Sequence, residues 1–315
     1  YVLVYYLVVN NFRSPDQLRR LVLTLLSSAA LVLTYGFYQY YCGVDASAAE
    51  WVDGEQFPEL KVRIFSTLEN PNLLAGFLVI MLSLVTGLGL YARTRLWRVL
   101  AMLLALALGV GLVLTYCRGA WLGLLAVVLV CGLVYDRRCF WVLPVVPLVL
   151  LFNQDALLER LLSIANPTDT SATLRMAMWG STLEMIADKP LTGIGWGAYW
   201  MVFPSYDSFI NDASTRMYHA HNTYLHLAAE IGLPGLTAFL LFVGCHARTA
   251  LRIFRQKRQE WIAGLMLGIL AAFAGMAVCG LTDHLLFSVQ LSMLFWLLCS
   301  LVTVAGLGEE AGERE

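Results

Sequence analysis

Long apolar runs separated by short polar segments dominate the sequence. A helix needs roughly 17–25 largely apolar residues to cross a hydrocarbon core about 30 Å thick. On this pattern we predict seven complete spans and an eighth apolar run that closes the chain, near 21–41, 72–91, 99–116, 120–135, 139–152, 222–246, 262–281 and 285–306. The pattern therefore predicts an all-α, polytopic transmembrane helical bundle, with residues 1–315 forming a single membrane domain.

The composition supports a membrane protein. The chain is 59% hydrophobic and 14% charged, whereas soluble proteins average roughly 45–50% apolar and about 25% charged residues. Residues 1–10, YVLVYYLVVN, are apolar but too short to span, and they lack both an initiator Met and the basic start of a signal peptide. We expect this segment to be the remnant of another span, so that the sequence lacks its N-terminal spans.

Basic residues gather in every second connection between the predicted spans. These connections are 13–20, 93–98, 137–138 and 248–258, and with Arg314 they hold 14 of the 21 Lys and Arg residues. Because basic loops are retained in the cytoplasm, we expect this face to be cytoplasmic. No basic stripe indicates a nucleic-acid partner.

The opposite, extracytoplasmic face receives the connections 42–70, 117–119, 153–220 and 282–284. The loop 153–220 is too long to be idle chain, since long structureless loops are uncommon. Within it, residues 173–188 have the spacing of a short amphipathic helix lying at the membrane surface, with an apolar stripe of Leu174, Met178, Leu183, Met185 and Ile186. The segment GIGWGAYW at 193–200 fits a close-packed turn better than a dinucleotide loop, because no strand precedes it.

Three arginines remain on the outer side, where the positive-inside tendency disfavours them. Arg118 lies in a very tight turn between two spans, Arg63 precedes a span, and Arg175 lies in the predicted surface helix. Each alone could snorkel to lipid headgroups. Gathered at one face, three guanidiniums would form a strong bidentate site for phosphate oxygens.

A second polar cluster lies where the long loop enters the next span, HAHNTYLHLAAEIGLPGL at 219–236. An imidazole at this interface is a candidate general base near neutral pH, or else a hydrogen-bonded structural residue. His219 and His221 could also be a metal pair, but no Cys or carboxylate follows at metal-ligand spacing, so we predict no metal and no cofactor. His226 and Glu230 are candidates for a buried pair, and the polar turn at 282–284 could simply be aqueous.

The residues of this second cluster resemble a family signature. The signature joins a His and a following amide or hydroxyl residue to two glycines, and here His221, Asn222, the nine residues 223–231, Gly232 and Gly235 fit it without a gap. By this pattern the chain resembles the O-antigen ligase and O-antigen polymerase superfamily of bacterial envelope glycan enzymes.

Three further segments are similar to family segments: Arg63 with the following NPN, Arg118 in RGAWLG, and Arg175 ahead of Trp179. The similarity covers roughly residues 60–245. The resemblance implies a metal-independent glycosyltransferase that moves a glycan from a polyprenyl diphosphate carrier to an acceptor hydroxyl at the outer face of the cytoplasmic (inner) membrane. It also implies His221 as the base, the three arginines as ligands of the diphosphate, and Asn222, Gly232 and Gly235 as supporting residues.

The acceptor could be a glycan, a lipid or a protein, because the signature does not separate ligases from polymerases or from protein O-glycosylating relatives. The alternative class is a polytopic transporter of a small solute such as bicarbonate. A transporter needs ionisable residues at mid-membrane depth along a path, and the predicted spans are nearly free of charge away from the outer face. Membrane lipid is a partner in either case.

Overall fold

The computed structural model describes residues 1–12, 14–43, 63–143, 170–207, 216–256 and 260–312, which fold into helices without any strand. Among the described residues, six helices are long and apolar enough to cross a membrane, and α5 is a shorter apolar helix. The predicted all-α polytopic bundle is therefore confirmed.

The α-helices are α1 (Leu3–Asn11), α2 (Pro15–Cys42), α3 (Pro71–Leu90), α4 (Arg95–Leu114), α5 (Arg118–Val134), α8 (Thr170–Asp188), α9 (Tyr199–Val202), α10 (Thr223–Gln256), α11 (Glu260–Cys279) and α12 (Val289–Gly312). Short 3-10 helices lie at η2 (Ser66–Leu68), η3 (Arg137–Val142), η4 (Phe203–Ser205) and η5 (Leu285–Phe287). The N-terminal residues form α1, which packs on α12 and joins it through a hydrogen bond between Tyr5 Oη and Thr303 Oγ1 (3.0 Å).

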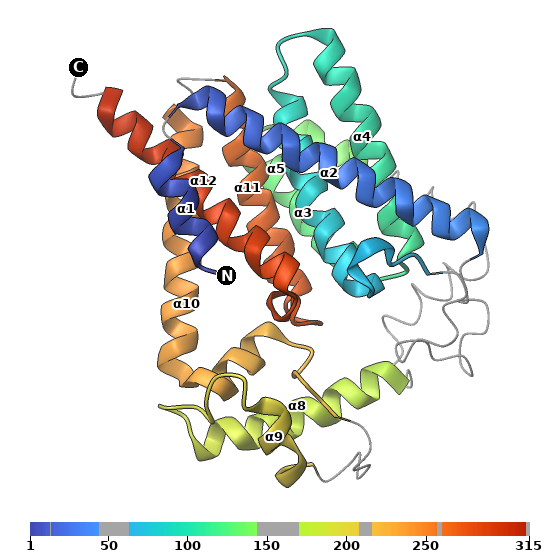
Figure 1. The fold of residues 1–315 in the computed structure, drawn as a ribbon, viewed down its shortest axis with the longest axis vertical. Coiled ribbons are helices and arrows are strands. Elements are labelled where there is room, and N and C mark those ends of the chain that lie inside the picture. Colours follow the sequence, from blue (N-terminus) through green and yellow to red (C-terminus); the bar gives the residue numbers. More distant parts are fainter. Residues whose placement is uncertain (13, 44–62, 144–169, 208–215, 257–259, 313–315) are drawn as a thin grey trace.

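Helices α3 and α11 form the centre of the bundle (Figure 1). Their close contact depends on glycines, because a methyl group at Gly87 would collide with the backbone at Gly264 and Gly268. Gly123 of α5 likewise lies against α11, where an added methyl group would approach Cys279 Sγ to 2.6 Å. Small residues allow helix backbones to approach closely inside a membrane, where packing rather than hydrophobicity drives association.

The predicted span at 139–152 begins as a 3-10 helix in its described part, and not as a spanning α-helix. Residues 137–142 form the 3-10 helix η3, which Asp136 caps by accepting a hydrogen bond from the Arg138 backbone N–H (2.8 Å). The local cap and the short polar turn favour a 3-10 geometry here over the start of a spanning helix. The rest of that predicted span, 144–152, lies outside the described residues.

Three basic connections meet at one end of the bundle. Arg93, in the α3–α4 connection, forms an ion pair with Glu260 at the start of α11 (2.7 Å). The Tyr91 ring lies 5.4 Å from that of Tyr135 and 6.1 Å from that of Phe254, near the ends of α5 and α10. The alternation of basic segments in the sequence therefore corresponds to a shared end in space.

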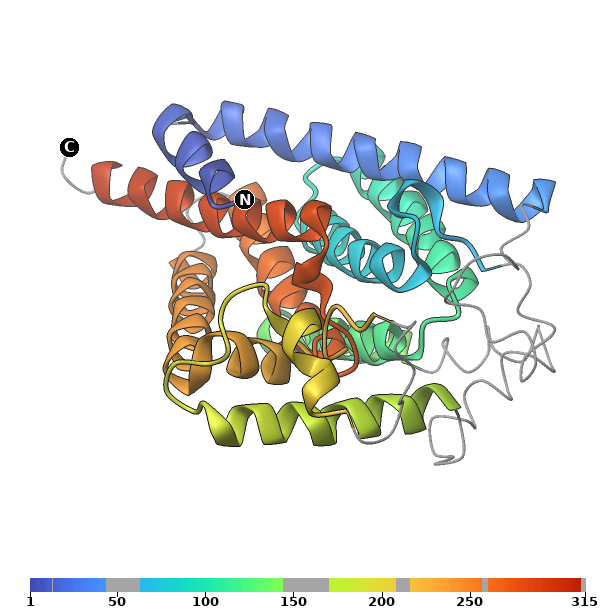
Figure 2. The same ribbon diagram turned by 60° about the horizontal axis from the view of Figure 1, so that its bottom comes forward.

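The opposite end carries α8 and α9. Helix α8 confirms the predicted helix at 173–188 and lies crosswise at the foot of α10 (Figures 1 and 2). Its buried face consists of Met178, Ser181, Thr182 and Met185, whereas Leu174 and Leu183 of the predicted stripe are exposed. The helix thus uses a narrower face to pack against the loop and α10 than its apolar spacing indicated.

Candidate active site

Arg63 is held by the ends of neighbouring helices. Its Nε donates to the Thr115 carbonyl at the end of α4 (2.8 Å), and Nη2 donates to Asn72 Oδ1 in the first turn of α3 (3.0 Å). The segment that follows is anchored on α2, because Gln39 Oε1 accepts from the Ser66 backbone N–H (2.7 Å). These bonds fix the guanidinium between the start of α3 and the end of α4.

Arg118 is the first residue of α5. The preceding Cys117 provides no side-chain cap for α5. The positive end of the α5 dipole also lies at this point, and it adds to the positive charge of the Arg118 guanidinium. Gly119 allows this helix start to lie directly against the turn after α11, since a methyl group there would collide with the Thr282 hydroxyl. The RGAWLG segment therefore brings Arg118 beside the polar turn at 282–284.

Arg175 is positioned by α8, which the loop before α10 holds in place. Trp179, one helical turn after Arg175, donates its Nε1–H to the Ala220 carbonyl (2.9 Å). Residues four apart lie on the same face of a helix, so the bond that fixes Trp179 also directs Arg175 toward the histidine-bearing loop.

The structure brings the three predicted arginines within electrostatic range of one another. Burial lowers the pKa of Arg63, and the positive charges of Arg175 and Arg118 lower it further, while Cys117 and Asp283 oppose these effects. An arginine remains charged in spite of such a shift. Three like charges that repel one another around a partly buried guanidinium favour an anion as their common ligand.

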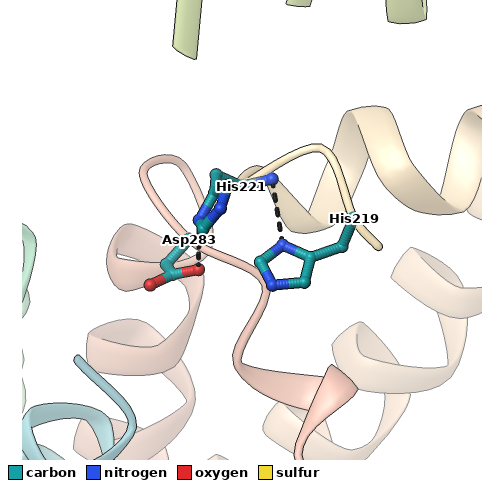
Figure 3. A group of neighbouring side chains, drawn as sticks. All are labelled: His219, His221 and Asp283. Carbon is teal, nitrogen blue, oxygen red and sulfur yellow. Dashed lines mark hydrogen bonds and ion pairs between the residues drawn. The ribbon is translucent and has the colours of Figure 1, made fainter. Parts of the chain in front are cut away.

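His221 lies beside Asp283, a residue from the turn between α11 and η5 (Figure 3). His221 Nδ1 and Asp283 Oδ1 are 3.1 Å apart, and the side chains are 34% and 13% exposed, respectively. Asp283 Oδ1 also accepts from the His284 backbone N–H (2.8 Å). A carboxylate at this ring nitrogen fixes the tautomer that leaves Nε2 as the proton acceptor.

The ionised form of Asp283 is favoured by its neighbours. Burial opposes ionisation, but the hydrogen bond and charge of His221, followed by the charges of His219 and Arg175, hold the pKa of Asp283 well below its usual range. The pKa of His219 is lowered to about 4, by burial first and then by the charge of His221. Asp283 is therefore a carboxylate and His219 a neutral ring near neutral pH.

Asn222 and Thr223 dock the histidine-bearing loop onto the α11 turn. Asn222 Oδ1 caps α10 by accepting from the Tyr224 and Leu225 backbone N–H groups, and its Nδ2 donates to the Leu281 carbonyl (3.1 Å). The Thr223 backbone N–H donates to the Gly280 carbonyl (2.8 Å). The amide of the signature thus begins the helix and ties it to the segment that carries Asp283.

Gly232 breaks the regular helical backbone of α10. It has φ +71° and ψ 172°, a conformation that side chains disfavour. The Gly-rich segment enters this break: the Ile194 N–H donates to the Ala229 carbonyl (2.8 Å), and the Gly195 N–H donates to the Glu230 carbonyl (3.0 Å). A methyl group at Gly193 would collide with that same carbonyl. The interpretation of 193–200 as a close-packed turn is confirmed.

The predicted contact between His226 and Glu230 is also confirmed. Both side chains are buried, and His226 Nε2 lies 3.6 Å from Glu230 Oε2. Glu230 Oε1 accepts from the Tyr199 backbone N–H (3.2 Å), which ties α9 to α10. The His226 ring lies 6.5 Å from that of His219, so the pair is adjacent to the site.

Left-handed backbone conformations cluster around the candidate residues. His221 has φ +46°, Tyr116 just before Arg118 has φ +53°, and Ser66 and Glu69, which follow Arg63, have φ +51° and +59°. They are the positive-φ non-glycine residues of the described chain. Such conformations cost of order 1–3 kcal/mol and concentrate at functional sites.

His219, His221 and Asp283 each offer one ligand atom, and these atoms lie within 4.8 Å of one another. The group is therefore small enough to surround a cation. Its charges are less favourable, because Arg175 acts on both Asp283 and His219 and the Asp283 carboxylate already accepts two hydrogen bonds. An arginine-rich surround disfavours a divalent cation and favours an anionic substrate.

The fold and this polar site define a multi-pass helical membrane protein with a concentrated site at one end of the bundle. Residues 103–240 match the family model for O-antigen ligase, which confirms the resemblance to the O-antigen ligase superfamily for this part of the chain. The match supports membrane glycosyl-transfer activity of the ligase or polymerase kind. No curated protein matches the chain significantly.

The matched segment contains Arg118, Arg175 and His221, whereas Arg63 and Asp283 lie outside it. Asp283 was missed by sequence reasoning, which interpreted the turn at 282–284 as an aqueous connection. The signal was present, since an Asp–His pair interrupts two otherwise apolar runs, but its partner lies more than 60 residues earlier in the chain and only the fold joins them.

Proposed function

We propose that this protein is a metal-independent glycosyltransferase that moves a glycan from a polyprenyl diphosphate carrier to an acceptor hydroxyl. The carrying observation is the pairing of His221 with a buried carboxylate, Asp283, beside three arginines, of which Arg63 interacts electrostatically with both Arg118 and Arg175. This arrangement supplies a base and an anion site at the same end of a membrane bundle. O-antigen ligase-like transfer requires both.

In this mechanism His221 Nε2 accepts the proton of the acceptor hydroxyl as its oxygen attacks the anomeric carbon of the donor. The bond from that carbon to the diphosphate breaks, and the diphosphate leaves with the electron pair. A positioned base contributes typically 10²–10⁴-fold to rate. Asp283 stabilises the imidazolium that forms, as a carboxylate does beside a catalytic histidine.

Arg63, Arg118 and Arg175 are assigned to the diphosphate. Negative charge grows on the leaving group in the transition state, so fixed cations lower the barrier more than they stabilise the bound substrate. The α5 N-terminus adds a partial positive charge in the same place. Asn222, Gly232 and Gly235 are supporting residues that shape the start of α10 rather than touch the reacting atoms.

We place the site on the extracytoplasmic face of the cytoplasmic membrane, opposite the gathered basic connections. This orientation follows the positive-inside tendency. The transporter alternative has no support in the most buried spans, since α3 and residues 261–279 and 289–307 contain no Asp, Glu, Lys, Arg or His. A solute pathway through them would lack the ionisable groups that transporters use.

His221→Ala tests the mechanism most directly. The ring lies at a wet interface, so its loss should leave insertion and donor binding intact while transfer of the glycan in membranes falls at least a hundredfold. Addition of a chelator should leave wild-type activity unchanged. Transfer by His221→Ala at near wild-type rate would reject the base assignment, and solute flux without glycan transfer would favour a transporter.

A further inference from the structure

A row of aromatic rings leads away from the candidate base. Trp200 of α9, Tyr218 of the loop before α10 and Phe287 of η5 have ring centroids 6.4 Å and 6.5 Å apart in that order. Phe287 lies 4.9 Å from the His219 ring, which is 4.1 Å from His221. Three separate segments thus contribute one continuous row that ends at the site.

The aromatic row is open to its surroundings. Trp200, Tyr218 and Phe287 are 37%, 49% and 50% exposed. Large rings that are contiguous and half exposed mark binding surfaces more often than isolated exposed residues do. None of the three rings belongs to the apolar core clusters, so part of each ring is accessible to a ligand.

The chemistry of the row suits a pyranose glycan. The faces of a sugar ring carry C–H groups whose partial positive charge is attracted to the negative face of an aromatic ring. The hydroxyls at the sugar's edge need polar partners, and Arg216, 5.5 Å above the Trp200 ring, and the Tyr218 hydroxyl are available there. The ring spacing is comparable to the length of one sugar unit, so successive aromatic rings could each receive a sugar.

The row and Arg63 approach the base through different neighbours. The electrostatic interactions of Arg63 reach Asp283, and those of Arg175 reach both Asp283 and His219. The aromatic row reaches His221 through the contact of Phe287 with His219. A substrate with its phosphates at the arginines and its reacting end at His221 would leave the row free for sugar units beyond the reacting end.

We propose that Trp200, Tyr218 and Phe287 form the binding site for the sugar units of the glycan substrate nearest the reacting end. This inference rests on the proposed function. The shared chemistry is a chain of pyranose rings, which either the acceptor or the carrier-linked donor can supply. Interfacial anchoring in lipid headgroups, a common role of Trp and Tyr, is the competing role that the experiment must exclude.

Binding is tested with the full chain in lipid nanodiscs on a printed array of pyranose oligosaccharides. Trp200→Ala, Tyr218→Ala and Phe287→Ala should each weaken the glycans bound by wild type about three- to tenfold. Trp196→Ala is the matched control. Trp196 belongs to the same Gly-rich segment as Trp200, is 78% exposed and lies outside the row. The control should bind as wild type does.

The proposal is overturned if wild type binds no glycan, if the row variants bind as well as Trp196→Ala, or if they lose only their membrane association.

In the transfer assay, a raised KM for the acceptor or for the lipid-linked donor identifies which substrate uses the row. His221→Ala should keep array binding while it loses transfer. Retained transfer by that variant would reject the base assignment without touching the glycan site, whereas unchanged binding by the row variants would reject the glycan site alone.

Discussion

Asp283→Asn removes one negative charge from the site with almost no change in volume. In the structure the carboxylate contacts His221 Nδ1 at 3.1 Å and accepts from the His284 backbone N–H at 2.8 Å. The Asn side-chain oxygen can preserve both contacts, so the loop should stay docked. What disappears is the charge that stabilises the imidazolium formed when His221 takes the acceptor's proton.

The expected loss follows from the strength of that contact. A hydrogen bond to a charged group contributes about 1.5–3 kcal/mol, and each 1.4 kcal/mol or so of barrier is about tenfold in rate. Asp283→Asn should therefore lower kcat by about one to two decades while the KM for the donor changes little. Asp283→Ala should be worse, because it also leaves the His284 N–H without its acceptor.

The assay is glycan transfer in membranes or nanodiscs, with the amount of folded protein measured by thermal unfolding of the same preparation. Asp188→Asn is the matched control: Asp188, on α8, accepts a hydrogen bond from the Tyr206 hydroxyl (2.7 Å) but lies away from His221. It should retain activity within about twofold. Wild-type kcat in a folded Asp283→Asn protein would refute the role of the Asp283 charge in stabilising the imidazolium.

The pH dependence of glycan transfer tests which side chain is responsible for the loss of activity in acid. Activity should fall on acidification because the base must be neutral to accept a proton. Asp283 cannot cause this fall, since its pKa is held well below its usual range and it stays ionised. His219, with a pKa of about 4, stays neutral above that pH, so His219→Asn should keep the same acid limb. Loss of the acid limb in that variant would move the titration to His219.

Three further outcomes are expected. Arg118→Ala should lose about one to two decades in rate. Arg118→Lys should fall between the Ala variant and wild type, since Lys keeps the charge without the bidentate fork. Full activity of the Ala variant would indicate a lipid-facing role. Gly193→Ala should lower the unfolding temperature by more than Gly197→Ala does. Both glycines have positive φ, but only Gly193 faces a backbone carbonyl, that of Glu230. Equal unfolding temperatures of the two variants would contradict this. In a Cys-free background, an impermeant thiol reagent should label Ser205→Cys and not Arg95→Cys in intact cells, and the reverse would overturn the orientation.

The apolar runs, the alternation of basic connections and the helical spacing of 173–188 are properties of local sequence, and the spans and helix α8 could be predicted from them. Gly232 and the nearby Pro234 indicated either a kink or close helix packing at this point of the span, and the structure has a break in the helix at Gly232. Spacing also indicated that His226 and Glu230 share one helix face. These features depend on residues close together in the chain.

The arrangement of the site is decided by the tertiary structure. Sequence indicated three outer arginines, but only the packing of α3, α4, α5 and α8 brings their charges within range of one another. The partner of His221 could not be predicted, because Asp283 reaches it through the contact of the α10 cap with the α11 turn. The aromatic row likewise joins three separate segments. Contacts of this kind depend on how helices pack, and no local pattern encodes them.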